Sequence, residues 1–223
     1  MASFRYAQFC PVARAAEIVG ERWTLLIVRE LLLGPRRFSD LSAPLSGISP
    51  SVLAGRLASL EERGVVARRT LPPPAAATVY ELTPRGERLE PMLLELGRWG
   101  IELLDARQAD DYFDPAWVEL ALRMLCRVTP TPERRFCVTV PLRVGELRLA
   151  VVGGESGASV SHEIAESDAS IHAESFVVMG MATGELDPED AIRSGALRAS
   201  GNVEALRDFP ALFQKPTPDT TGD

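Results

Sequence analysis

The spacing of apolar residues changes once along this chain of 223 residues, and the change limits the folds that the chain can adopt. Up to about residue 103, apolar side chains recur every three to four residues, which indicates amphipathic helices. After about residue 135 they alternate with polar ones, which indicates half-buried strands. The sequence therefore predicts an α+β protein with a mainly helical domain over 1–107, an acidic linker over 108–115, a domain with an antiparallel sheet over 116–213 and a flexible tail over 214–223.

The charges follow the same division. Residues 1–107 hold 14 basic and 12 acidic side chains, a difference of +2, whereas residues 108–223 hold 10 and 19, a difference of −9. The overall charge of −7 would argue against a nucleic-acid partner. Because the acidic excess lies in the second half, that argument does not extend to the first domain.

Other signals narrow the location and chemistry of the protein. No apolar run approaches the roughly 18 residues that span a bilayer, and the first residues lack the pattern of a signal peptide, so we expect a cytoplasmic protein without membrane insertion. The three cysteines, Cys10, Cys126 and Cys137, include no CxxC pair. We therefore expect reduced thiols and no structural zinc site.

Start and stop signals divide the first domain into short elements. They predict helices over 11–19 and 23–31, a helical turn or two over 36–41, and a helix that begins at Ser49-Pro50. Two β-prone segments, 65–70 and 78–83, are expected to form a ribbon, and a single helix of about five turns follows it as far as Leu103. This order is typical of a winged helix-turn-helix, in which one helix enters the major groove beside a wing.

The helix that begins at Ser49-Pro50 has residues suited to reading DNA. Leu53, Leu57 and Leu60 share its core face, and small polar residues lie opposite, where they let the helix approach base edges. Arginine donates paired hydrogen bonds to phosphates and guanine edges. Taken alone, Arg56 fits equally well a surface helix residue paired with Glu61 or with another neighbouring residue. The candidate DNA-binding residues are Arg36, Arg37, Ser49, Ser51, Val52, Gly55, Arg56, Arg68 and Arg69.

Several blocks in this half, in order over about residues 5–105, resemble the HxlR-type winged-helix transcriptional regulators. They include Cys10-Pro-Val, Gly20-Glu-Arg-Trp-Thr-Leu-Leu, Ile48-Ser-Pro-Ser-Val-Leu-Ala-Gly-Arg-Leu and Tyr80-Glu-Leu-Thr-Pro-Arg-Gly86. The resemblance implies a homodimer that reads a two-fold, double-stranded DNA operator with paired helices. The alanine-rich wing tip lacks the basic residues that such tips often carry, which argues against a minor-groove contact there.

The same resemblance makes Cys10 a candidate sensor of oxidants or electrophiles, because some such regulators use the cysteine at this position. Arg5 and Arg14 are near enough in sequence to favour its thiolate. The alternative is that Cys10 is a buried, small apolar residue near a dimer interface.

The second half is similar to the sterol-carrier-protein-2 domain over about 116–213, chiefly through the segment from Gly184 to Asn202 and Phe209-Pro-Ala-Leu-Phe213. That similarity implies an apolar ligand held between sheet and helices. We expect helices over 115–126, 187–194 and 202–212 around the antiparallel strands. The candidate pocket residues are Phe113, Trp117, Met124, Phe176, Met179 and Met181. Ordinary packing in the core would explain each of them equally well.

Catalysis has little support in the sequence. His162 and His172 lack the HExxH spacing, and Asp187, Glu189 and Asp190 are typical of a helix start. We therefore expect no enzyme, no cofactor and no metal, but a homodimeric, sequence-specific transcriptional regulator that responds to an apolar small molecule. The alternatives are a thiol-based redox- or electrophile-sensing repressor acting through Cys10, and a lipid-binding protein that uses the winged helix for dimerisation.

Overall fold

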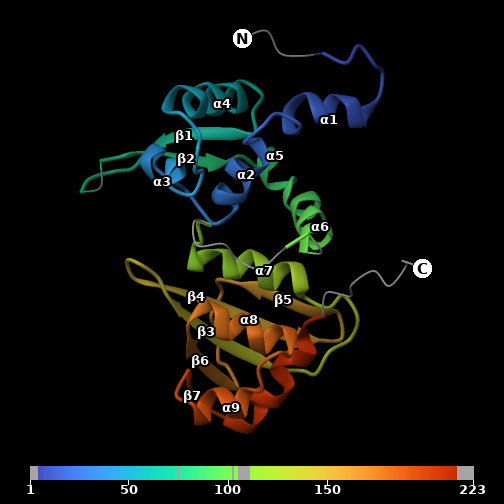
Figure 1. The fold of residues 1–223 in the computed structure, drawn as a ribbon, viewed down its shortest axis with the longest axis vertical. Coiled ribbons are helices and arrows are strands. Elements are labelled where there is room, and N and C mark those ends of the chain that lie inside the picture. The colour runs from blue at the N-terminus through green and yellow to red at the C-terminus, as the bar shows by residue number, and fades with distance from the viewer. Residues whose placement is uncertain (1–4, 75, 102, 105–110, 215–223) are drawn as a thin grey trace. The chain divides into compact units, whose positions relative to one another are not determined.

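The computed structural model describes residues 5–74, 76–101, 103–104 and 111–214, which form two compact units divided between Leu93 and Leu94 (Figure 1). We call them the N-terminal and C-terminal units. The division lies earlier in the chain than the expected linker, of which residues 108–110 fall outside the described residues, as does the expected tail from 215 onward. The functional domain boundaries stay a prediction.

The N-terminal unit has the predicted winged helix-turn-helix order. Ser49 caps α4, because its hydroxyl accepts a hydrogen bond from the Val52 amide at 3.3 Å, and Gly64 ends that helix region with a positive φ of 66°. Arg36 and Tyr80 pair through their backbones beside the ribbon. The elements are α1 (Pro11–Val19), α2 (Thr24–Leu32), α3 (Phe38–Ser42), α4 (Pro50–Glu62), the antiparallel pair β1 (Val66–Thr70) and β2 (Thr78–Leu82), and α5 (Pro84–Glu87).

One apolar core holds these elements together. The expected leucines of α4 are fully buried in it, with Trp23 and Phe38 packed at its edge. This packing fixes the rotation of α4 about its axis, since the side chains opposite the leucines must face outward. The core residues are Ile27, Leu31, Leu41, Leu45, Leu53, Leu57, Leu60, Val65 and Val66.

The prediction of a single five-turn helix after Thr83 is wrong, because this segment forms two helices, α5 and α6 (Glu90–Ile101). Thr83 caps α5 as predicted, with its hydroxyl accepting from the Gly86 amide at 3.1 Å. Pro91 has no amide hydrogen to donate to the preceding turn, so a continuous helix would lose a hydrogen bond there. Pro91 instead lies in the first turn of α6, where that loss has no cost.

The C-terminal unit is built on a five-stranded sheet in the order β5-β4-β3-β6-β7. Around it lie the 3-10 helix η1 (Pro115–Trp117), α7 (Val118–Leu125), α8 (Ser175–Thr183), α9 (Pro188–Arg193) and the 3-10 helix η2 (Val203–Leu212). The strands are β3 (Arg135–Pro141), β4 (Glu146–Gly154), β5 (Gly157–Ser161), β6 (Ala169–Ala173) and β7 (Leu197–Gly201).

Three expectations for this unit are corrected. The sheet is mostly antiparallel, but β6 runs parallel to β3, because the β5–β6 connection crosses the sheet before β6 begins. Strand β7 was not anticipated, since its segment has few of the residues that favour strands. The last helix is of the 3-10 type, and Pro210 inside it removes a backbone donor that an α-helix would use.

Helices cover one face of this sheet, with α8 lying across it in Figure 1. Phe136 of β3 packs edge-on against Phe209, which packs in turn against Phe213, with ring centroids 5.3 and 5.2 Å apart. Phe213 also pairs with Cys126 at the end of α7, so the last segment of the unit contacts its first helix. Within the described ranges, no helix has the length and apolar character needed to cross a membrane.

Candidate functional site

The outward face of α4 is small and open. Ser51, Val52 and Gly55 are exposed, and no atom lies within 4 Å of the point where a side chain on Gly55 would begin. At the helix start, the Ser49 and Ser51 hydroxyl oxygens lie 3.1 Å apart. The leucine packing therefore presents a helix whose N-terminal half another molecule can approach closely.

The candidate arginines fall into two groups. Arg37, just before α3, and Arg68, on β1, are exposed and form no ion pair with the described residues. Arg69 is held by Glu81 across the ribbon, with 2.9 Å between Nη2 and Oε2, and this hydrogen bonding raises the pKa of Arg69. Arg36 is partly buried, and its Nε has no hydrogen-bond partner among the described residues.

Arg56, like Arg69, forms an ion pair with a glutamate, and the sequence did not predict which one. Its guanidinium pairs with Glu21, from the segment before α2, and not with Glu61 as considered above. The Arg56 side chain is only 19% exposed, and its Nε is buried without a hydrogen-bond partner in the part of the chain that the structure describes. A contact between Arg56 and a phosphate would require the Glu21 pair to open. No short-range sequence signal links these two residues.

Cys10 is the most accessible of the three cysteines. It is partly exposed and stands at the N-cap position of α1, whereas Cys126 and Cys137 are buried. One of the two arginines expected to act on it, Arg14, is paired with another residue, since its guanidinium lies 2.9 Å from the Glu17 carboxylate. A hydrogen bond from the Tyr6 amide to that carboxylate lowers the pKa of Glu17. Burial raises the pKa of the Cys126 thiol to about 11.

An apolar pocket of about 300 Å³ lies within the C-terminal unit, between η1, α7 and α8. Four of the six candidate pocket residues line it: Phe113, Trp117, Phe176 and Met179. The other two lie elsewhere, because Met181 is buried in the core and the Met124 side chain packs against Gly97 of α6. The sequence reasoning missed Val118, Ala121, Ser175, Gly180, Thr183 and Glu185, which complete the lining.

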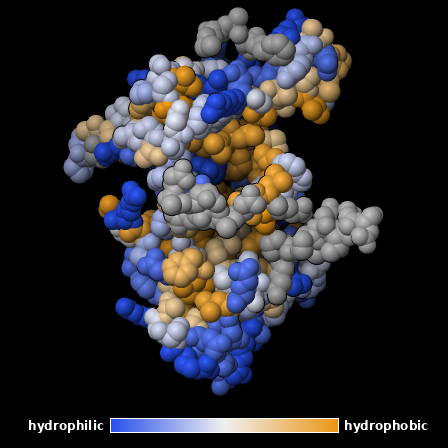
Figure 2. All heavy atoms as spheres, in the orientation of Figure 1, coloured by the Kyte–Doolittle hydropathy of each residue, from blue (hydrophilic) through white to orange (hydrophobic). Residues whose placement is uncertain are grey.

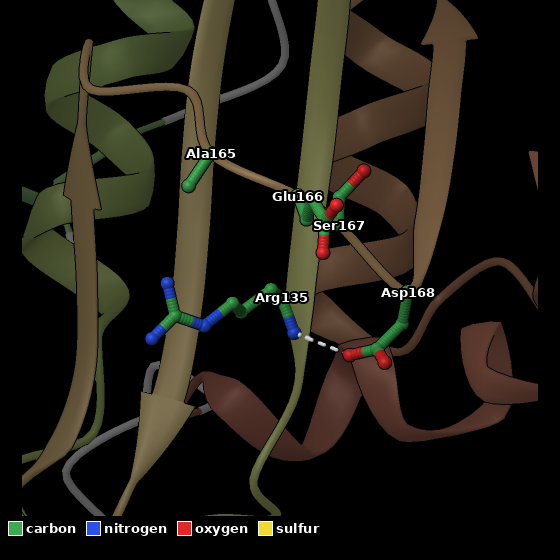
Figure 3. Close-up of a pocket in the computed structure, with 5 residues that line it drawn as sticks. All are labelled: Arg135, Ala165, Glu166, Ser167 and Asp168. Carbon is green, nitrogen blue, oxygen red and sulfur yellow. Dashed lines mark hydrogen bonds between the residues drawn. The ribbon is translucent and has the colours of Figure 1, made fainter.

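A second, polar pocket forms where the β5–β6 connection passes over the sheet. Figure 3 shows that the Arg135 amide donates to the Asp168 carboxylate, at 2.7 Å, while the Arg135 guanidinium points away from it. Ala165, Glu166 and Ser167 complete this pocket. The amide contact ties the end of the connection to the start of β3, which explains Asp168 as a structural residue.

The two histidines do not come together. The His162 Nε2 lies 3.1 Å from Oε1 of Glu119, a buried carboxylate on α7 that Arg123 also approaches, whereas His172 lies on β6. Asp187 caps α9, accepting from the Glu189 and Asp190 amides, as expected for a helix start. No group of three or more metal-ligating side chains occurs among the residues with a described position.

Two protein families match the chain. Residues 18–108 match the HxlR-like helix-turn-helix family, and residues 128–214 match the SCP-2 sterol transfer family. Among curated relatives, the uncharacterized HTH-type transcriptional regulator YvaP of Bacillus subtilis (strain 168) is 40% identical over 100 residues, which cover 44% of this chain and 93% of the relative. The HTH-type transcriptional regulator YodB of the same organism is 35% identical over 91 residues, covering 40% and 81% respectively.

Solved structures match a similar share of the chain. The reduced form of the transcriptional regulator YodB from B. subtilis has 31% identity and a TM-score of 0.39, covering 45% of this chain and 100% of that one. The redox regulator HypR in its oxidized form has 28% identity and a TM-score of 0.41, covering 44% and 100%. The family matches confirm both resemblances inferred from the sequence.

The difference in burial among the cysteines predicts selective labelling. At pH 8, a thiol with a pKa of about 11 is ionised in about one molecule in a thousand, so Cys126 should resist alkylation until the pH rises toward 11 or the protein unfolds. We expect iodoacetamide to label Cys10 first, as measured by peptide mass spectrometry, and Cys10→Ser to remove this early label. Equal labelling rates for Cys10 and Cys126 in the folded protein would contradict the prediction.

Proposed function

The chain belongs to the HxlR-like helix-turn-helix family of transcriptional regulators, and from this premise we propose that it binds a DNA operator as a homodimer, through α4. The observation that carries the proposal is the outward face of α4, where Ser51, Val52 and Gly55 are exposed opposite buried leucines. A helix with small residues on this face can enter the major groove until its backbone lies close to base edges.

The exposed arginines supply the attraction to phosphate. Arg37, which precedes α3, and Arg68, on the ribbon, are the residues that we propose to contact the DNA backbone beside α4. Their contacts release counterions, and operator affinity should therefore fall steeply with added salt. Arg56 joins them once DNA displaces Glu21, which makes its contribution conditional on docking.

The two family matches support a division of roles. We assign DNA binding and dimerisation to residues 1–107 and ligand binding to residues 116–213, joined by 108–115, in a protein that acts in the cytoplasm. The apolar pocket between α7 and α8 is the candidate site for a small-molecule effector. Its lining offers apolar contacts and few polar groups, which suits binding and not catalysis.

Footprinting tests the operator proposal. The purified protein is titrated onto DNA that flanks its own gene, in the presence of excess competitor DNA. We expect a protected segment with two-fold symmetry that persists against competitor. Protection spread evenly along the fragment, and lost as competitor is added, would refute sequence-specific binding.

Substitution of Gly55 separates folding from DNA binding. Both Gly55→Ala and Gly55→Leu should stabilise the N-terminal unit by about 0.5–1 kcal/mol, because they remove the flexibility of glycine inside an exposed helix. Only the leucine should lower operator affinity, by about tenfold or more, since it holds α4 away from base-edge contacts worth about 1–3 kcal/mol each. Thermal unfolding and gel-shift titration measure the two effects. Equal operator affinity for both variants would rule out close approach by α4.

The pairing of Arg56 gives a second prediction. Glu21→Gln should raise operator affinity about two- to fivefold at low salt, because it removes a partly exposed ion pair that competes with phosphate. Glu61→Gln, which removes the same charge from the exposed face of α4, is the matched control. If both variants gain equally in a gel-shift titration, the gain reflects net charge, and the competition between Glu21 and DNA does not exist.

An apolar stripe along α6 supports the homodimer. Met92, Leu96 and Trp99 recur at the spacing of one helix face and are exposed, with Trp99 63% accessible, and exposed Leu103 follows in the turn after α6. The opposite side of the helix is occupied, since Met124 packs against Gly97 and the Arg98 side chain donates to the Met124 carbonyl. A second copy of the chain would cover the exposed stripe.

Truncation of the central aromatic side chain tests this surface. Trp99→Ala should weaken the dimer about thirtyfold, because a tryptophan at the centre of an interface commonly contributes about 2 kcal/mol or more. Val144→Ala removes an even more exposed apolar side chain, 91% accessible, from the β3–β4 turn and should leave the dimer unchanged. Analytical ultracentrifugation over a range of concentrations measures both. A Trp99→Ala dimer as stable as wild type would place the interface elsewhere.

A further inference from the structure

The pocket between η1, α7 and α8 has a composition that favours one class of ligand. Three of its lining side chains are aromatic: Phe113, Trp117 and Phe176. Glu185, which follows α8, is the only charged side chain in the described lining, which holds no arginine, lysine or histidine. The pocket thus combines aromatic surfaces with a single negative charge.

The aromatic rings are arranged as walls and not as a stack. Phe113 and Trp117 meet edge to face, with centroids 6.2 Å apart and planes at 83°. Trp117 also meets Tyr112, with centroids 5.7 Å apart and planes at 59°. An aromatic ring that lines a pocket attracts a cation through its quadrupole, most strongly in tryptophan. The attraction grows when the cation sheds water, as it does against an apolar surface.

The pocket is open at an apolar mouth. Phe176 is 70% exposed and Phe113 is 40% exposed, and Figure 2 shows hydrophobic side chains at the surface of the C-terminal unit over α8, next to a hydrophilic surface over α9. A volume of about 300 Å³ suits a compact molecule of the size of a small drug. An apolar ligand can therefore enter without rearrangement of the fold.

Electrostatics then selects among apolar ligands. A carboxylate or sulfate at this position would face Glu185 with no basic side chain in the lining to offset the repulsion. Residues 108–223, with 10 basic and 19 acidic side chains, add a field of the same sign. A positively charged group would instead gain both from Glu185 and from the ring faces.

We propose that this pocket binds a lipophilic organic cation, such as a quaternary ammonium or phosphonium compound, in which apolar groups surround a single positive charge. Cation binding is a property of the C-terminal unit and does not depend on the proposed function. Only an effect of the cation on operator binding rests on the proposed effector role of the pocket. The aromatic side chains contact the apolar groups, and Glu185 provides the charge that distinguishes this ligand from a neutral lipid.

Two probes of the same shape and opposite charge test the proposal on the full chain. Tetraphenylphosphonium and tetraphenylborate are titrated separately by isothermal calorimetry in the absence of DNA. We expect the cation to bind at least about tenfold more tightly than the anion. Equal affinities, tighter binding of the anion, or no binding of the cation would each overturn the proposal.

Variants then connect the selectivity with the named residues. Glu185→Gln should weaken binding of the cation about three- to tenfold while leaving the anion unchanged or tighter. Phe176→Leu keeps an apolar side chain of similar reach but removes the ring, and should weaken the cation by about the same factor. Glu155→Gln, an identical charge change in the β4–β5 turn outside the pocket, should have no effect. If Glu155→Gln lowers cation affinity as much as Glu185→Gln does, the preference for cations comes from the overall charge and not from the pocket.

A final measurement keeps this inference distinct from the proposed function. Operator binding is titrated with and without saturating tetraphenylphosphonium. If the cation binds but operator affinity does not change, the cation site stands and the effector role fails. If operator affinity responds only to neutral apolar compounds, the effector role stands and the selectivity for cations fails.

Discussion

The packing of Leu53, Leu57 and Leu60 into the core of the N-terminal unit is the constraint on which DNA recognition depends. These three side chains are buried on one side of α4, so the helix cannot rotate without exposing them to water. The identity of the outward residues follows from that single requirement. The Ser49 cap adds a defined starting point, which sets how far the N-terminus of the helix projects.

Charge is distributed so that attraction to DNA is local and restrained. Arg37 and Arg68 are exposed and form no ion pair with the described residues, whereas Arg56 and Arg69 are bound to carboxylates. Such pairs weaken non-specific attraction to phosphate, because each pair must open, at a cost in free energy, before its arginine can bind another anion. A site that makes further contacts would offset this cost. The second half has an acidic excess, and the apolar pocket between η1, α7 and α8 has Glu185 in its lining.

Signals that act over a few residues were readable in the sequence, and pairings between distant segments were not. The caps at Ser49 and Thr83 and the leucine face of α4 were predicted because each depends on neighbours within about four residues. The break before Pro91 was not predicted, because the regular apolar spacing on both sides of it is typical of one continuous helix. The parallel partner of β6 and the pairing of Glu21 with Arg56 depend on how remote segments meet, which periodicity does not encode.

The contact between the two ends of the C-terminal unit has a consequence for how the protein is made. The Arg127 amide donates to the Leu212 carbonyl at 3.0 Å, the Gln214 amide donates to the Leu125 carbonyl at 2.8 Å, and Phe213 seals the core between them. These bonds join segments made early and late in synthesis of the unit, so its sheet and helices stay incomplete until the final residues leave the ribosome. The N-terminal unit lies wholly upstream of these segments, so its own long-range contacts, such as the pairing of Arg36 with Tyr80, can form first. A nascent chain would therefore complete the helix-turn-helix fold before the C-terminal unit can close.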